Sequence, residues 1–112
     1  MKRTVALAMI VAASSGACGS SSIDDHPCPP GGTTLTYRNF GEPFFASHCV
    51  SCHGGANGYS SRSFTTVDAI RGDRERIFRN AADDNTTMPP GPDDPPESER
   101  RKLGEWLACG AP

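Results

Sequence analysis

The stretch that decides the fold of this chain is Cys49-Val50-Ser51-Cys52-His53. Its two thiols lie three residues apart, so one turn of helix carries both, and an imidazole follows directly after the second thiol. C-x-x-C-H is the attachment sequence of c-type haem. In such a site the thiols bind the two vinyl groups on one edge of the porphyrin, and the next residue comes under the iron. The motif therefore predicts one covalent haem, held by Cys49 and Cys52, with His53 as proximal iron ligand.

Three other uses of paired cysteines compete with this interpretation. A thioredoxin-like redox site needs a βαβ framework, and the chain shows no strands long enough to build a sheet. A zinc site needs a second pair of ligands at ligand spacing, whereas Cys28 and Cys109 lie far apart in the sequence. A structural disulfide between Cys49 and Cys52 is the third alternative.

The sixth iron ligand has to come from elsewhere in the chain. Met88 is the only methionine beyond the first nine residues, and it precedes Pro89 and Pro90. Two adjacent prolines restrict the loop that would hold the thioether, and thioether ligation raises the reduction potential relative to bis-histidine ligation. We therefore predict His53 and Met88 as the metal ligands. A methionine that fills a gap in the core is the alternative.

Two histidines are rivals for the same position. His48 directly precedes Cys49, so its side chain is expected to point away from the haem edge that the cysteines hold. It is interpreted as a surface or helix-end residue. His26 lies in a flexible stretch rich in Ser, Asp, Pro and Gly. Met88 is preferred over both.

The N-terminus has the pattern of a targeting segment. Lys2 and Arg3 precede an apolar run over residues 4–13, which small residues follow. A permanent transmembrane helix needs about 20 apolar residues, so the shorter run fits a secretory signal that is removed. We predict a signal peptide over residues 1–17.

Cys18 would then be the first residue of the mature chain. Residues 15–18 resemble a bacterial lipoprotein cleavage box, although Ser15 stands where leucine is usual. The Gly and Ser residues that follow are typical of a flexible tether. We predict a lipid on Cys18, with ordinary cleavage after Ala17 as the alternative.

Composition limits the remaining possibilities. The chain has 112 residues, which allows one domain, and its net charge is −2. Without a clustered basic face, nucleic acid and anionic membrane surfaces are not expected partners. Apolar residues are few, while glycine and proline number twelve and ten. A covalent haem would supply the apolar body that such a small core lacks.

Helical spacing of apolar residues predicts an all-α fold of three main helices. The first is expected to begin at Tyr37 or at Gly41 and to end near Cys49, and Pro43 suits the later start. The second is expected over residues 66–82, after a Gly- and Ser-rich loop. Its apolar face comprises Val67, Ile70, Ile77, Phe78 and Ala81.

The last helix is expected to follow a second loop over residues 83–96. Asp94 can cap it, Pro95 can take its first position, and Glu97 can complete a capping box. Its buried stripe is predicted to contain Leu103, Trp106 and Leu107, and the helix should end at Cys109-Gly110.

Together these features resemble the class I cytochrome c family over roughly residues 37–112. In that family, a glycine eight residues and an aromatic residue four residues before the first haem cysteine lie where the terminal helices cross. Gly41 and Phe45 occupy these positions. Leu103 and Trp106 match the partners on the last helix, and Met-Pro-Pro matches the usual distal ligand loop. The resemblance implies a small cytochrome c fold, with helices and long loops wrapped around one haem c.

The resemblance also divides the chain. Residues 1–17 are predicted as signal peptide, residues 18–36 as lipid-anchor tether and Pro/Gly-rich linker, and residues 37–112 as the cytochrome c domain. Once Cys18 is assigned to lipid and the motif cysteines to haem, Cys28 and Cys109 remain. In an oxidising compartment they are predicted to form a disulfide, with two unpaired thiols as the alternative.

The implied function is that of an electron carrier, without an open site for substrate and without enzyme activity. The expected partners are redox protein donors and acceptors, and a membrane through the lipid on Cys18. The expected location is periplasmic or on the outer surface. Alternatives are the haem-bearing domain of a peroxidase or other oxidoreductase with a displaceable Met88, and a haem-based sensor. The arginines at positions 71, 74, 76 and 79 are interpreted as a solvated helix face. One of them, or Arg62, could pair with a haem propionate, and the sequence leaves open which one does so.

Overall fold

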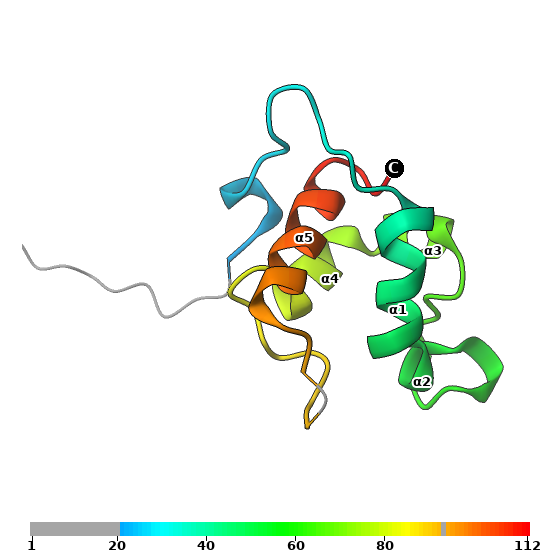
Figure 1. Cartoon of the computed structure of the whole chain (residues 1–112). Helices are drawn as coiled ribbons and strands as arrows, with labels where there is room; N and C mark the ends of the chain where they lie inside the picture. Colours follow the sequence, from blue (N-terminus) through cyan, green and yellow to red (C-terminus); the bar gives the residue numbers. More distant parts are fainter. Residues whose placement is uncertain (1–20, 93) are drawn as a thin grey trace, which may run out of the picture.

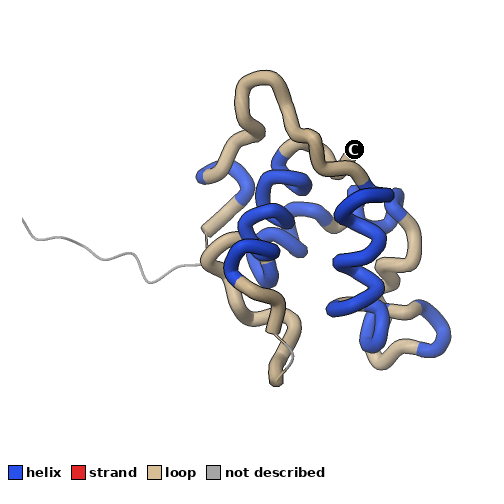
Figure 2. The backbone as a smooth tube through the Cα atoms, viewed as in Figure 1, coloured by secondary structure: helices blue, strands red, loops and turns tan. Residues whose placement is uncertain are grey.

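The computed structural model describes residues 21–92 and 94–112, and in this part of the chain it contains helices and loops but no strand (Figure 2). The all-α prediction is confirmed. The predicted signal peptide and the lipid site at Cys18 lie outside the described residues. The helical elements, in chain order, are the 3₁₀ turn η1 (Ile23–Asp25), the π turn η2 (Tyr37–Gly41), α1 (Glu42–His48), α2 (Val50–His53), the 3₁₀ turn η3 (Gly55–Asn57), α3 (Val67–Gly72), α4 (Arg74–Ala81) and α5 (Glu97–Ala108).

The first predicted helix combines both of its expected starts. The chain turns in at Tyr37 as a π turn and continues from Glu42 as α1, so the two elements run together. Pro43 explains the π turn, because a proline ring in an α-helix clashes with the carbonyl four residues earlier. The wider turn accommodates the ring, and the Glu42 N–H donates instead to the Tyr37 carbonyl. Thr36 caps the start by accepting a hydrogen bond from the Asn39 N–H at 3.1 Å.

The second predicted helix is wrong as a single element, because it breaks between α3 and α4. Asp73 at the break has φ −108° and ψ 11°, outside helical geometry. Gly72 before it is a poor helix former. The Asp73 carboxylate also accepts from Arg62 Nη1 at 2.9 and 3.1 Å, which holds this residue toward the preceding loop. The predicted apolar face survives the break, with Val67 half-buried and the other four residues buried.

The last helix begins later than predicted. Pro96 is the N-cap and Glu97 the first helical residue, and no side chain caps this end. The predicted capping by Asp94 is therefore wrong. Two consecutive prolines explain the shift, because the residue before a proline is disfavoured from helical geometry, which excludes Pro95. The predicted stripe of Leu103, Trp106 and Leu107 is fully buried.

The core takes most of its residues from the first helix, α3, α4 and α5. Figure 1 shows α4 beside α5. Trp106 is fully buried. Its ring packs against the rings of Tyr37, Phe40 and Phe45, with centroids 6.5, 6.2 and 6.3 Å apart. A Cβ atom at Gly41 would lie 2.6 Å from two atoms of the Trp106 ring, so this position requires glycine. The residues that resemble the helix-crossing set of class I cytochromes c therefore do meet in space.

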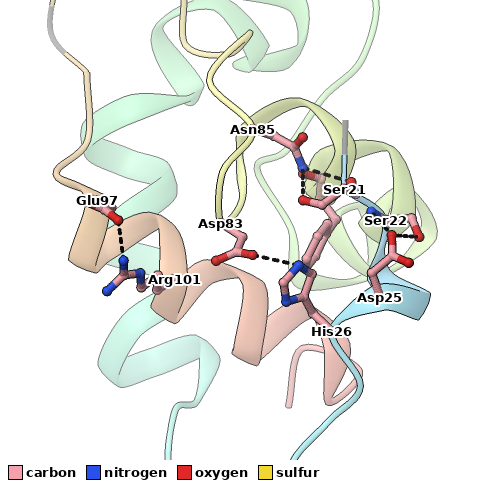
Figure 3. A network of polar contacts seen from close by, with 9 residues as sticks. Ser21, Ser22, Asp25, His26, Asp83, Asn85, Glu97 and Arg101 are labelled. Atoms are coloured by element: carbon pink, nitrogen blue, oxygen red, sulfur yellow. Dashed lines mark hydrogen bonds and ion pairs between the residues drawn. The ribbon is translucent and has the colours of Figure 1, made fainter. Parts of the chain in front are cut away.

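Residues 21–36 form a segment that lies against the helices, and we refer to it as the strap. Its turn η1 contacts α4 and α5. His26 Nε2 lies 2.7 Å from Asp83 Oδ2, and Asn85 Nδ2 donates to the Ser21 carbonyl at 3.0 Å (Figure 3). A disulfide joins Cys28 of the strap to Cys109 at the end of α5, with Cα atoms 4.7 Å apart. The strap is thereby held to the loop after α4 near its first residues and to the end of α5 near its middle.

Candidate functional site

A cleft of about 310 Å³ lies between α2 and the loop that joins α4 to α5. Figure 1 shows these two segments apart from each other, α2 below α1 and the loop below α4 and α5. The four residues predicted to hold haem all line this cleft: Cys49, Cys52, His53 and Met88. The other lining residues are Phe45, His48, Ser60, Arg62, Phe64, Arg76, Ile77, Asn80, Ala81, Pro89 and Pro90.

The motif forms a single short turn of helix. Cys49 has φ −123° and ψ −44°, which separates α1 from α2, and its carbonyl accepts from the His53 N–H at 2.9 Å. This bond closes one helical turn around both thiols, as the spacing requires. The chain then folds back on this turn, because the Ser60 N–H donates to the Cys52 carbonyl at 2.9 Å. A Cβ atom at Gly58 would lie 2.5 Å from that same oxygen, so the return depends on glycine.

The imidazole of His53 is oriented by its surroundings. Its Nδ1 lies 2.9 Å from the Arg62 carbonyl oxygen, which only accepts hydrogen bonds, so Nδ1 carries the proton. Nε2 is left with its lone pair, as a metal ligand needs. The ring stacks on Phe64 with centroids 4.5 Å apart. A bond to the far nitrogen of a ligating histidine sets its tautomer and raises its basicity.

The surroundings of Cys49, which is half-buried while Cys52 is exposed, bear on the uses proposed for the two cysteines. Cys49 and Cys52 are not bonded to each other in the structure. Burial raises the pKa of the Cys49 thiol to about 12, partly opposed by the charge of Arg100. Reactive redox cysteines have lowered pKa values, and zinc sites bind thiolates. A protonated thiol against an apolar cleft instead suits addition to the vinyl group of a porphyrin.

The backbone of Met88 forms hydrogen bonds with residues of two helices. Its N–H donates to the Asn80 carbonyl in α4 at 2.7 Å, and its carbonyl accepts from Arg100 Nη1 in α5 at 2.7 Å. The residue is 42% exposed, unusual for a large apolar side chain in a domain this small. A methionine that fills a gap in the core is normally buried, so this exposure argues against that alternative.

The two rival histidines differ in their positions. His48 is the last residue of α1, which confirms its interpretation as a helix-end residue, and it also lines the cleft. His48 Nδ1 is buried and has no hydrogen-bond partner among the described residues. His26 lies away from the cleft, against Asp83.

Five arginines were left open as partners of a haem propionate, and the structure places two of them at the cleft. Arg62 and Arg76 line it, and both face Asp73, at 2.9 and 3.9 Å. Arg71 is turned elsewhere, donating to the Ala111 carbonyl at 3.0 Å. The cleft therefore has cationic side chains at one margin, where acidic groups of a ligand would be favoured.

Some residues that line the cleft had no signal in the sequence, because they lie outside the apolar helical pattern. Phe64 lies in a stretch predicted as a loop, and Asn80 stands next to the apolar face of α4 rather than on it. Their presence completes a wall of aromatic, aliphatic and amide groups. With two thiols and an imidazole on one side, a thioether on the other and apolar walls between, the residues present fit haem c.

The described residues contain neither a cluster of metal-binding side chains nor a membrane-spanning helix. Residues 21–92 and 94–112 hold no group of three or more His, Cys, Asp or Glu side chains placed to bind a metal ion. In the same residues, every helix is too short or too polar to cross a bilayer.

Comparison with known proteins identifies the family. The model of the family described as cytochrome C oxidase, cbb3-type, subunit III matches residues 39–107, more than half of the chain. Neither the curated proteins nor the solved structures contain a significant match. The matched region begins within η2 and ends within α5, so it includes all the residues that line the cleft. The chain belongs to this family of c-type cytochrome domains, which carry a covalently bound haem c and take part in electron transfer.

Proposed function

We propose that this protein is an exported monohaem cytochrome that carries single electrons between redox proteins. The observation that supports this most directly is the convergence of Cys49, Cys52 and His53 with Met88 on one cleft. The first three residues share one helical turn, whereas Met88 lies in the loop between α4 and α5, so local sequence alone does not require Met88 to meet them. A carrier of this kind needs both axial positions of the iron filled, so that no substrate site is open.

Each of the four residues has a defined task in this proposal. Cys49 and Cys52 form the thioethers, His53 supplies the proximal imidazole through Nε2, and Met88 supplies the distal thioether. Bound haem c supplies an iron that cycles between Fe(III) and Fe(II). Arg62 and Arg76 hold positive charge at the margin of the cleft, where the haem propionates would be neutralised.

The second candidate is a haem subunit of a larger oxidoreductase. It is favoured by the name of the matching family, which refers to an oxidase subunit. Such a subunit also transfers electrons, so the two candidates differ in whether the domain works alone or in a stable assembly. Carriers that exchange partners use small, weak interfaces, whereas permanent complexes bury larger apolar surfaces.

Export and tethering complete the proposal. The predicted signal peptide over residues 1–17 and a lipid on Cys18 would place the haem domain, over residues 37–112, at a membrane surface. Residues 21–36 of the predicted tether over residues 18–36 form the strap, which is bound to α5 and to the loop after α4, so only the residues before the strap would act as a free tether. The bond between Cys28 and Cys109 supports an oxidising compartment, because disulfides persist there. A tether would raise the effective concentration near membrane-bound partners.

Replacing Met88 by alanine tests the ligand set. Ligation of ferric haem iron by a thioether gives a weak far-red absorption band. Because the thioether would be lost, we expect the ferric variant to lack this band and the reduced variant to bind carbon monoxide at the open position. Thr87→Ala is the matched control, since this exposed neighbour should leave both properties unchanged. Visible spectra of the two variants and the parent are the measurement. Carbon monoxide binding by the reduced parent at neutral pH would contradict the carrier and favour an enzyme or sensor.

Removing the disulfide between Cys28 of the strap and Cys109 at the end of α5 tests whether the native protein contains this bond. The Cys28→Ala, Cys109→Ala double variant is expected to lose about 4 kcal/mol of unfolding free energy, because the bond closes a loop of 81 residues in sequence separation. Denaturant melts of the haem-loaded protein measure this difference. A loss below about 1 kcal/mol, together with alkylation of both thiols in the parent, would show that the native cysteines are unpaired.

A further inference from the structure

Arg100 is the one charged residue on the buried stripe of α5. The stripe otherwise consists of Leu103, Gly104, Trp106 and Leu107, and Arg100 is only 3% exposed. A leucine at this position would continue the apolar face. Burying a guanidinium is costly unless its donors are satisfied, so the position demands a reason other than packing.

The partners of Arg100 are main-chain carbonyls of the loop after α4. Its Nη1 lies 2.8 Å from the Ala81 oxygen, 3.1 Å from the Asn85 oxygen and 2.7 Å from the Met88 oxygen. The loop also contacts the backbone of Arg100, because the Asp83 N–H donates to the Arg100 carbonyl at 2.9 Å. Residues 81–88 are therefore gathered around one side chain of α5.

An ion pair does not account for this burial. The nearest carboxylate, Asp94, lies 3.6 Å from Nη2 and is itself 59% exposed. That distance is longer than a hydrogen bond, and Nη2 has no hydrogen-bond partner among the described residues. Exposed, loosely paired carboxylates contribute little, so the three carbonyls are the main compensation for the buried charge.

We propose that Arg100 is a positioning residue that keeps the Met88 thioether on the haem iron. This rests on the proposed ligation by Met88. The Met88 carbonyl accepts from Arg100 in α5, and the Met88 N–H donates to the Asn80 carbonyl in α4, so the backbone of Met88 cannot move away from the cleft without breaking one of these bonds. All three bonds come from Nη1, at the end of a long side chain. A lysine ammonium also carries three donors but lies on a shorter side chain, so it should replace these bonds only in part.

Imidazole binding to the haem-loaded ferric protein tests the proposal. Imidazole competes with Met88 for the iron, so its apparent affinity rises when the loop opens more often. We expect Arg100→Leu to raise the association constant at least tenfold, which corresponds to about 1.4 kcal/mol and lies within the range for a hydrogen bond to a charged group. Arg100→Lys should give a smaller rise. The far-red band should weaken in the same order.

Two controls separate positioning from general destabilisation. Arg101→Leu removes the neighbouring arginine, which is exposed and pairs with Glu97. Ile70→Val weakens the core in α3, outside the cleft. Both should leave imidazole affinity within twofold of the parent, and an equal rise in Ile70→Val and Arg100→Leu would overturn the proposal.

Met88→Ala, measured in parallel, distinguishes the two proposals. A large rise in imidazole affinity in Met88→Ala, without a rise in Arg100→Leu, would overturn the role of Arg100 and leave Met88 as the ligand. No rise in Met88→Ala would overturn the ligand and the role of Arg100 together. If Arg100→Leu does not mature, Arg100→Lys decides: a rise above twofold supports the proposal, and parental affinity contradicts it.

Discussion

The Cys49→Ala, Cys52→Ala double variant is expected to contain no covalent haem and to lose its cooperative unfolding transition. Phe45, Phe64 and Ile77 line the cleft. Without the cofactor, these side chains would have no apolar group to pack against on that side. A domain this small has little other core to compensate, so loss of a large apolar body should abolish stable folding. Intact mass, the visible spectrum and far-UV circular dichroism measure the three consequences.

Ser51→Ala is the matched control for this experiment. Ser51 lies between the two cysteines and is exposed, so its replacement should leave haem attachment and the melting curve unchanged. A double variant that lacks haem but melts cooperatively at the parental temperature would show that the helices pack without the cofactor. That result would contradict the argument that haem forms the centre of the core.

Gly41→Ala is expected to destabilise the protein by about 3 kcal/mol, with a fall in melting temperature of more than about 10 °C. The new Cβ would lie 2.6 Å from Trp106 Cζ2 and Cη2, and 3.1 Å from Tyr37 Cδ2. Trp106 cannot move aside easily, because its Nε1–H donates to the Pro112 carbonyl at 3.0 Å and its ring is enclosed by aromatic neighbours. The first helix would have to separate from α5. Thermal melts of haem-loaded protein give the measurement.

Gly72→Ala is the control that isolates this close approach. No atom lies within 4 Å of a Cβ at Gly72, and the residue is the last of α3. Since alanine is a better helix former than glycine, this change should be neutral or stabilising by up to about 1 kcal/mol. Equal losses from both substitutions would mean that the crossing of the first helix with α5 does not depend on the missing side chain.

The predictions from sequence were most successful where a local pattern carries the information. The helical class and the apolar faces of α4 and α5 follow from spacing along the chain. The pairing of Gly41 with Trp106 was implied by the resemblance to class I cytochromes c, and the structure confirms it. They were least successful at element boundaries. The π turn before Pro43, the break at Asp73 and the start of α5 after Pro96 depend on how neighbouring segments compete for the same backbone groups.

The site divides in the same way. By itself the sequence determined the chemistry, because two thiols and an imidazole within five residues need only one helical turn to act together. Only the tertiary structure decided that Met88 lies across the cleft from them, that Arg62 and Arg76 line its margin, and that Arg100 binds the Met88 carbonyl. Such contacts join segments far apart in the chain, and a main-chain carbonyl leaves no mark in the sequence. Their positions follow from packing of whole helices, which no local pattern encodes.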